Sequence, residues 1–182
     1  MNSTPTTVPS LLSLHRRDFT IKRAIDTAGF MFIVAAGFRW MAPPATPPPG
    51  VDLSFEIAMS KWIPVGALAI ATVALLILAR RYFWVKKVIT QGVTLKGKVE
   101  DVDVYEREAS HGSNTPAFQR PTVRSYYAII RYSWNGEDKT VSLKLPNSPS
   151  TYGTFKGHDV DLIVHESAPN HPLIHAVYLG RF

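Results

Sequence analysis

The first half of the chain contains two apolar runs with the length and low charge of membrane-spanning helices. The clearer run is eighteen residues without a charged side chain, and it starts at Trp62. A run of this length is typical of a transmembrane helix. Trp62 and Trp84 lie 22 residues apart, roughly 33 Å at helical rise, which matches the hydrocarbon layer plus its interfaces. We predict a transmembrane helix over 62–84; a buried helix of a globular core is the alternative.

The other apolar run is shorter and has charges near its ends. Residues 24–42 span nineteen positions, roughly 28 Å as a helix, and Trp40 stands near the end. Asp26 follows Lys22 and Arg23 by four and three residues, so its charge can be paired on one helix face. We predict a second transmembrane helix over these residues, with a re-entrant or interfacial helix as the alternative.

After residue 91 the pattern changes to an alternation of apolar and polar side chains, which is typical of half-buried β-strands. Asn135-Gly136 separates two alternating stretches and is a strong signal for a tight hairpin. The alternation predicts strands around Lys96–Tyr105, Tyr126–Trp134, Thr140–Leu145, Asp159–His165 and Leu173–Leu179. The mixed pattern of the first of these indicates a bulge or a twist.

These patterns predict an α+β membrane protein, in which a two-helix transmembrane hairpin precedes a small antiparallel β-barrel or sandwich of about five strands. The expected parts, in chain order, are a cytoplasmic tail 1–23, the first helix 24–42, a short Pro-rich outside loop 43–61, the second helix 62–84 and a cytoplasmic β domain 91–182.

Charge refines this picture because it is distributed unevenly. The net charge is +6, and all of it belongs to residues 1–90, which hold ten Lys/Arg against four Asp/Glu. The β domain is neutral, which argues against nucleic-acid binding. Basic residues flank both helices, whereas the connecting loop 43–60 has none, so both termini are predicted to be cytoplasmic at the plasma (inner) membrane.

The residues expected to fix this topology and to meet lipid head groups are Arg16, Arg17, Lys22, Arg23, Arg80, Arg81, Lys86 and Lys87, with Trp40, Trp62 and Trp84 as interface anchors. Arg16-Arg17 also resembles part of a twin-arginine export signal. Asp26 interrupts the approach to the apolar run, so we interpret the basic residues as a topology signal.

The candidate chemistry of the chain is sparse. The absence of cysteine excludes disulfides, cysteine zinc sites and a cysteine nucleophile. No phosphate loop, nucleophile elbow or HExxH motif occurs, so no catalytic residue and no cofactor are predicted. Histidines gather near the C-terminal end, but their spacing matches no metal motif. His165, His171 and His175 are kept only as alternative metal ligands.

Four short segments, Gly97-Lys98-Val99, Tyr126 to Gly136, Gly157 to Val164 and Pro169 to Pro172, resemble the motifs of domain-of-unknown-function family 3592. The resemblance covers roughly Val93–Leu179. It implies a small β domain attached to one or two membrane helices, and no established activity. His165 departs from the family pattern, which has a tyrosine there.

The sequence thus favours a non-enzymatic inner-membrane protein whose cytoplasmic β domain is an interaction or assembly module, for example an accessory subunit of a larger membrane complex. Its expected partners are the lipid bilayer and either another membrane protein or a second copy, through exposed sheet edges or the loop Ala109–Pro121. The alternatives are an immunity or envelope-stress protein and a metal or small-molecule sensor that uses the histidine-rich end.

Overall fold

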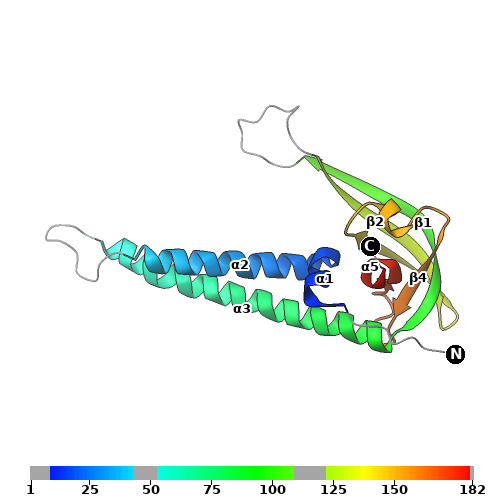
Figure 1. Ribbon diagram of the computed structural model, residues 1–182, viewed down its shortest axis with the longest axis horizontal. Helices are drawn as coiled ribbons and strands as arrows, with labels where there is room; N and C mark the ends of the chain where they lie inside the picture. Colours follow the sequence, from blue (N-terminus) through cyan, green and yellow to red (C-terminus); the bar gives the residue numbers. More distant parts are fainter. Residues whose placement is uncertain (1–8, 43–52, 109–121, 181–182) are drawn as a thin grey trace. The chain divides into compact units, whose positions relative to one another are not determined.

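The computed structural model describes residues 9–42, 53–108 and 122–180. The chain divides into two compact units, which are described separately: one is Leu14–Val85, and the other is Lys86–Phe182 with the N-terminal residues up to Ser13. The first unit is helical and the second contains an antiparallel sheet, so the α+β class predicted from the sequence is confirmed (Figure 1).

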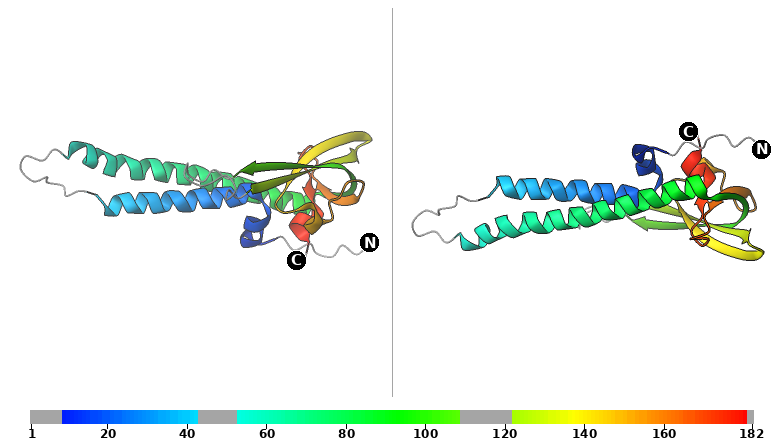
Figure 2. Two further views of the ribbon diagram at one scale, coloured as in Figure 1. Left: turned by 90° about the horizontal axis from the view of Figure 1, so that it is seen from above. Right: turned by 90° about the horizontal axis from the view of Figure 1, so that it is seen from below.

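The helical unit contains two long helices, α2 (Phe19–Trp40) and most of α3 (Ser54–Gln91), preceded by the short α1 (Leu11–Arg17). The two long helices lie side by side in every view (Figures 1 and 2). Their buried side chains are small: Ala24, Ala28 and Ala35 on α2, and Ala67, Ala71 and Ala74 on α3. Spacings of three, four and seven residues place each set on one face of its helix, as in a coiled-coil seam.

Both helices start before their predicted bounds; α2 ends at Trp40, two residues before its predicted end, and α3 continues past its predicted end to Gln91. The α2 helix starts at Phe19 because Asp18 caps it, accepting hydrogen bonds from the backbone N–H groups of Thr20 and Ile21. The α3 helix starts at Ser54, so Pro64 lies in its interior and removes one helical hydrogen bond. The predicted start at Trp62 would place Pro64 in the first turn, but the apolar run alone does not mark the start of the helix.

Within the part of the chain that the structure describes, one helix, α3, is long and apolar enough to cross a membrane. Only 17% of its most apolar window is buried, whereas the core helix of a soluble protein is mostly covered. The exposed side chains on α3 include Phe55, Trp62, Val65, Leu68, Ile70, Val73, Leu76, Ile77 and Phe83. They lie on several sides of the helix, so α3 is apolar nearly all round.

The β unit is built on one sheet with the strand order β3-β2-β1-β4-β5 and antiparallel pairing throughout. Its strands are β1 (Val93–Glu108), β2 (Thr122–Trp134), β3 (Glu137–Leu145), β4 (Asp159–Val164) and β5 (Leu173–Ile174). The predicted hairpin is confirmed, with Asn135 and Gly136 at φ 53° and 84°. The predicted bulge is confirmed as a register shift between Val99 and Asp101.

Five antiparallel strands were predicted correctly, but the sheet is open, whereas the sequence suggested a barrel or sandwich. Among the described residues, no pairing joins the outer strands β3 and β5. The last strand is also shorter than expected, because Leu173–Leu179 divides into β5 and the helix α5 (His175–Leu179). A two-residue strand offers too few backbone groups to continue the sheet toward closure.

One face of the sheet forms the core of the β unit. Val99, Ile130 and Leu162 on three neighbouring strands are fully buried there. The connection from β3 to β4, which contains α4 (Pro149–Tyr152), and the helix α5 supply the side chains that complete this core. Burial raises the pKa of Tyr132, whose hydroxyl donates a hydrogen bond to the Pro169 carbonyl.

A single glycine joins the end of α3 to the sheet. A Cβ atom at Gly92 would lie 2.4 Å from the Val88 carbonyl oxygen, 2.7 Å from the Ile163 side chain and 3.0 Å from the Val164 carbonyl oxygen. Two of these three neighbours are backbone atoms, which cannot move away easily. Gly92 therefore allows the last turn of α3, with Val88 and Ile89 buried, to pack closely against β4.

We expect Gly92→Ala to lower the stability of the β unit by about 1–3 kcal/mol, because the added methyl group must displace backbone. The measurement is the thermal unfolding midpoint of the full chain in detergent. Gly66→Ala is the matched control, since no atom lies within 4 Å of its added Cβ. Equal midpoints for the two variants would contradict this account of the joint.

Candidate functional site

A buried carboxylate connects α2 and α3. The Asp18 side chain is 2% exposed; its Oδ2 accepts a hydrogen bond from Nε of Arg81 at 2.9 Å and forms an ion pair with Nη2 of Arg81, also at 2.9 Å. Its Oδ1 is the acceptor that caps α2. Asp18 therefore satisfies the start of one helix and the guanidinium of the other, which aligns the two helices antiparallel at this end.

Arg81 is held on a second side by an aromatic ring. Its guanidinium carbon lies 4.4 Å from the centre of the Trp84 ring, one turn further along α3, a cation–π arrangement. The sequence placed Arg81 among the residues that meet lipid head groups and Trp84 among the interface anchors. In the structure these two residues contact each other, and Arg81 also binds Asp18.

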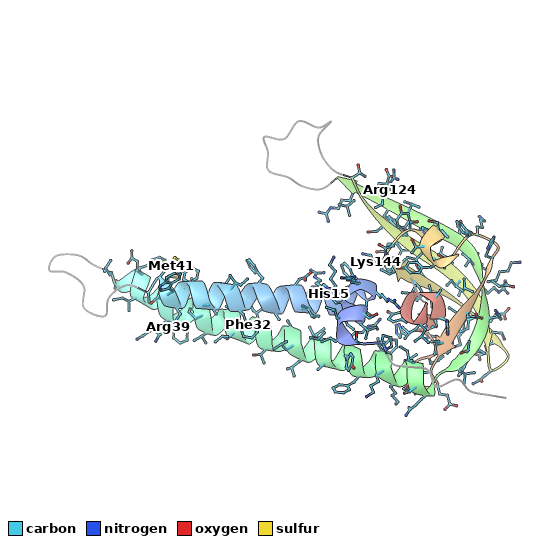
Figure 3. All side chains as sticks on the ribbon, viewed as in Figure 1. His15, Phe32, Arg39, Met41, Arg124 and Lys144 are labelled. Carbon is cyan, nitrogen blue, oxygen red and sulfur yellow. The ribbon has the colours of Figure 1, made fainter. Side chains whose placement is uncertain are left out.

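The other basic residues of the predicted set are mostly exposed. Arg16, Lys22, Arg23, Arg80, Lys86 and Lys87 are exposed, and Arg17 is half-buried. Oδ1 of Asp26 lies 3.4 Å from Nε2 of His15, within hydrogen-bonding distance, and among the described residues it has no ion pair with Lys22 or Arg23, which the sequence predicted. The α1 helix supplies this histidine, which a search along α2 alone could not find (Figure 3).

Two of the three predicted interface tryptophans lie at the opposite end of the helix pair from Asp18. Trp40 is 91% exposed and ends α2, and Trp62 is 72% exposed on α3. Nineteen residues separate Trp62 from Arg81 on α3, roughly 28 Å at 1.5 Å per residue. This length is close to the thickness of the hydrocarbon layer of a bilayer.

The histidine-rich end of the chain is not assembled as a metal site. His165 accepts hydrogen bonds at Nδ1 from the N–H and hydroxyl of Ser167, and its Nε2 lies 3.4 Å from the Gln91 side chain. His171 lies in the turn before β5, and His175 begins α5. Within residues 9–42, 53–108 and 122–180, no group of three or more His, Asp or Glu could hold a metal ion.

The outer face of the sheet carries an aromatic hollow. Tyr105 and Tyr127 meet edge to face, with ring centres 5.3 Å apart, and with Ser142 they line a shallow hollow of about 320 Å³. The Lys144 ammonium lies 5.7 Å from the centre of the Tyr127 ring. Figure 3 labels Lys144 on β3 and Arg124 on β2. The hollow is open and holds no recognisable acid–base pair, so it offers a contact surface more readily than a reaction centre.

The long strand β1 has an open edge beside this hollow. Its pairing with β4 ends at Lys98, and the Val99 backbone makes the last bonds on that side, to His158 and Gly157. From Glu100 onward, β2 is the only strand that pairs with β1 among the described residues. An unpaired strand edge presents free N–H and C=O groups and can accept a further strand.

Most charged side chains on this part of β1 already have partners. Glu100 lies 3.7 Å from Arg131, Glu106 lies 2.7 Å from Arg124, and Asp101 lies 3.4 Å from Lys156. The hydrogen bond from the Val102 N–H, which is the largest single cause, and the contact with Lys156 lower the pKa of Asp101. The predicted contact loop Ala109–Pro121, which follows this edge, lies outside the described residues.

Sequence reasoning missed the pairing of Asp18 with Arg81. The two residues are 63 positions apart, and both appeared to belong to a charged flank. One signal was available: an aspartate directly before an apolar helical run is a common N-cap. An aspartate that caps a helix keeps its carboxylate close to the helix start. The sequence can then be searched for a cationic residue that pairs with this carboxylate.

We expect Arg81→Gln to destabilise the helix pair by on the order of 3 kcal/mol, because it removes a cation that is paired with the buried Asp18 carboxylate. The neighbouring Arg80→Gln is the matched control: Arg80 is exposed, so its loss changes stability by about 0.5 kcal/mol or less. Thermal unfolding in detergent compares the two. A midpoint for Arg81→Gln within error of Arg80→Gln would contradict the role given to the pair.

We expect Lys156→Met to raise the pKa of Asp101 but to leave it below the ordinary aspartate value, since the hydrogen bond from the Val102 N–H, the largest single cause of the depression, remains. With a lowered pKa, the Asp101–Lys156 contact persists at neutral pH and is lost as the pH falls through that pKa. Carboxyl-carbon NMR of the labelled full chain measures this. Lys139→Met is the control, because the ion pair of Lys139 is with Glu137 and not with Asp101.

Comparison with known proteins adds no relative to this picture. No family model, no curated protein and no solved structure matches the chain. The resemblance to domain-of-unknown-function family 3592 therefore stays a prediction, and the functional argument rests on the residues themselves.

Proposed function

We propose that this chain is a non-enzymatic, multi-pass protein of the plasma (inner) membrane. In this proposal α2 and α3 form a transmembrane hairpin with both termini in the cytoplasm, and the β unit is a cytoplasmic interaction or assembly module. The observation that carries the proposal is the apolar outer surface of α3, of which only 17% is buried in its most apolar window.

The exposed apolar surface supports an apolar surrounding medium. Soluble monomers rarely expose contiguous apolar patches larger than a few hundred Å². Large exposed apolar side chains also occur on α2, including Phe30 at 60% and Ile33 at 72% exposure. Two adjacent helices with this surface would lose the hydrophobic contribution of all these side chains in water, and they retain it in lipid.

The distribution of polar groups on the helix pair supports a spanning orientation. Asp18, Arg81 and most of the basic side chains mark one end, and Trp40 and Trp62 mark the other. The roughly 28 Å between Arg81 and Trp62 fits the hydrocarbon layer. Because basic residues stay on the cytoplasmic side, the Asp18 end would face the cytoplasm.

The sheet supports an interaction role for the β unit. The open edge of β1 offers unpaired backbone groups. The adjoining part of the β1–β2 pair exposes Val104, Tyr105 and Val123 at 50–60%. Exposed aromatic and apolar side chains beside a free edge are typical of surfaces that accept another protein strand. A partner there would pair with the β1 edge and cover these exposed side chains.

Labelling of single cysteines tests the topology, and the chain contains no native cysteine to interfere. We expect Thr46→Cys, in the loop between the helices, to react with a membrane-impermeant maleimide in intact cells. Ser142→Cys, on the exposed face of β3, should react only after the membrane is opened.

Both variants should remain in the membrane fraction after extraction at alkaline pH. Labelling of Ser142→Cys in intact cells would reverse the proposed orientation, and release of the protein by alkali would contradict a spanning anchor. Labelling of both sites from the same side would show that α3, which lies between them in the chain, does not cross the membrane, and would contradict the hairpin.

A further inference from the structure

The open edge of β1 has a pattern of side chains that is complementary to itself. Beyond the bulge, the side chains alternate between two faces. Val102, Val104 and Glu106 share the face of the buried Val99. Asp103, Tyr105 and Arg107 share the opposite face, which carries the aromatic hollow.

Two charged residues on this edge have no ion pair in the described part of the chain. They are Asp103 and Arg107, of opposite sign, at equal distances on either side of Tyr105. By contrast, Glu100, Asp101 and Glu106 are all paired within the unit. The two unpaired charges are too far apart along one strand, about 13 Å, to pair with each other.

Antiparallel pairing with a second copy brings these charges together. In the register that places Tyr105 opposite Tyr105 of the second copy, each Asp103 lies opposite an Arg107, and this happens twice across the two-fold axis. On the other face, Val104 lies opposite Glu106, whose carboxylate also binds Arg124. No like charges are opposed among the described side chains, and opposite-charge and aromatic cross-strand pairs both stabilise a sheet.

Other registers that keep each residue opposite one on the same face are less favourable. Centring the pair on Asp103 or on Glu106 opposes two identical carboxylates, which destabilises pairing. Centring it on Val104 places Arg107 opposite Asp101, which is already held by Lys156 and the Val102 N–H, and leaves Asp103 opposite a tyrosine. The register centred on Tyr105 alone uses both unpaired charges.

We propose that the β1 edge binds the β1 edge of a second copy of this chain, antiparallel and centred on Tyr105, so that two five-stranded sheets form one continuous sheet. This deepens the proposed interaction role of the β unit and rests on it. The contact involves about six residues of each copy, which is small for a stable dimer in free solution. Anchoring of both copies in one membrane raises their effective concentration and favours pairing.

Disulfide trapping of the full chain in its native membrane tests the register. A disulfide needs Cα atoms within about 7 Å, so Tyr105→Cys should form a covalent dimer on mild oxidation. Val104→Cys, the neighbouring position on the other face, and Arg107→Cys should not do so alone. Co-expressed Asp103→Cys and Arg107→Cys chains should form a mixed dimer, because these positions lie opposite each other.

The trapping results separate the alternatives. Equal dimer yields for Tyr105→Cys and Ser142→Cys would show random collision and overturn the proposal. A higher yield for Val104→Cys would overturn the register, and a disulfide between Tyr105→Cys and a different protein would show another occupant. A monomeric Tyr105→Cys chain whose unfolding midpoint matches the wild type would also overturn it, while the labelling results on membrane topology would stand.

A charge exchange tests the same contact without cysteine. We expect Arg107→Asp and Asp103→Arg each to weaken dimerisation roughly tenfold, since each creates two like-charge pairs in the dimer. The double variant Asp103→Arg/Arg107→Asp should restore it, because the opposite charges are exchanged between copies. Mass photometry of the protein in nanodiscs across a concentration series measures the dimer fraction. Failure of the double variant to recover, with both single variants weakened, would contradict the direct pairing.

Discussion

The apolar outer surface of α2 and α3 is the constraint on which the arrangement of the remaining residues depends. Exposed Phe, Ile and Trp side chains contribute to stability where water is excluded from them, as in the membrane location proposed for these helices. In such a medium every polar group must be satisfied internally or lie at an end. The alanine seam fits such a medium for a different reason. It lets the two backbones approach closely without using the large apolar side chains, which remain on the outside.

The pair between Asp18 and Arg81 follows from the same constraint. A helix start has N–H groups without partners, and a start beside an apolar layer cannot rely on water for all of them. Asp18 supplies the acceptor, but it also brings a buried negative charge, which Arg81 neutralises through a hydrogen bond and an ion pair. Trp84 then covers the guanidinium. One turn of α3 thereby supports the cap of α2, so the start of α2 and this turn of α3 are stabilised together.

Much of the fold was predictable because the signals were local. The uncharged run after Trp62, the turn at Asn135-Gly136 and the irregular alternation around Val99 each lie within a few residues and each gave the correct element. The failures involved distant or ambiguous information. Asp18 finds Arg81 only in three dimensions, and His15 reaches Asp26 from a helix outside the predicted span. Leu173–Leu179 alternates as a strand does, but burial of Val177 and Tyr178 is achieved by a helical turn. The open edge of β1 could not be predicted, since periodicity does not reveal where a neighbouring strand ends.

The bulge between Val99 and Asp101 lies where the number of strands that pair with β1 falls from two to one among the described residues. A bulge bends its strand and increases the local twist, and here it occurs where the pairing with β4 stops. Before the bulge, β1 is an interior strand with a neighbouring strand on each side. After the bulge, the same strand is an edge strand. The bulge therefore coincides with the change of β1 from an interior strand to an edge strand. One additional residue, Glu100, gives a single strand two different positions in the same sheet.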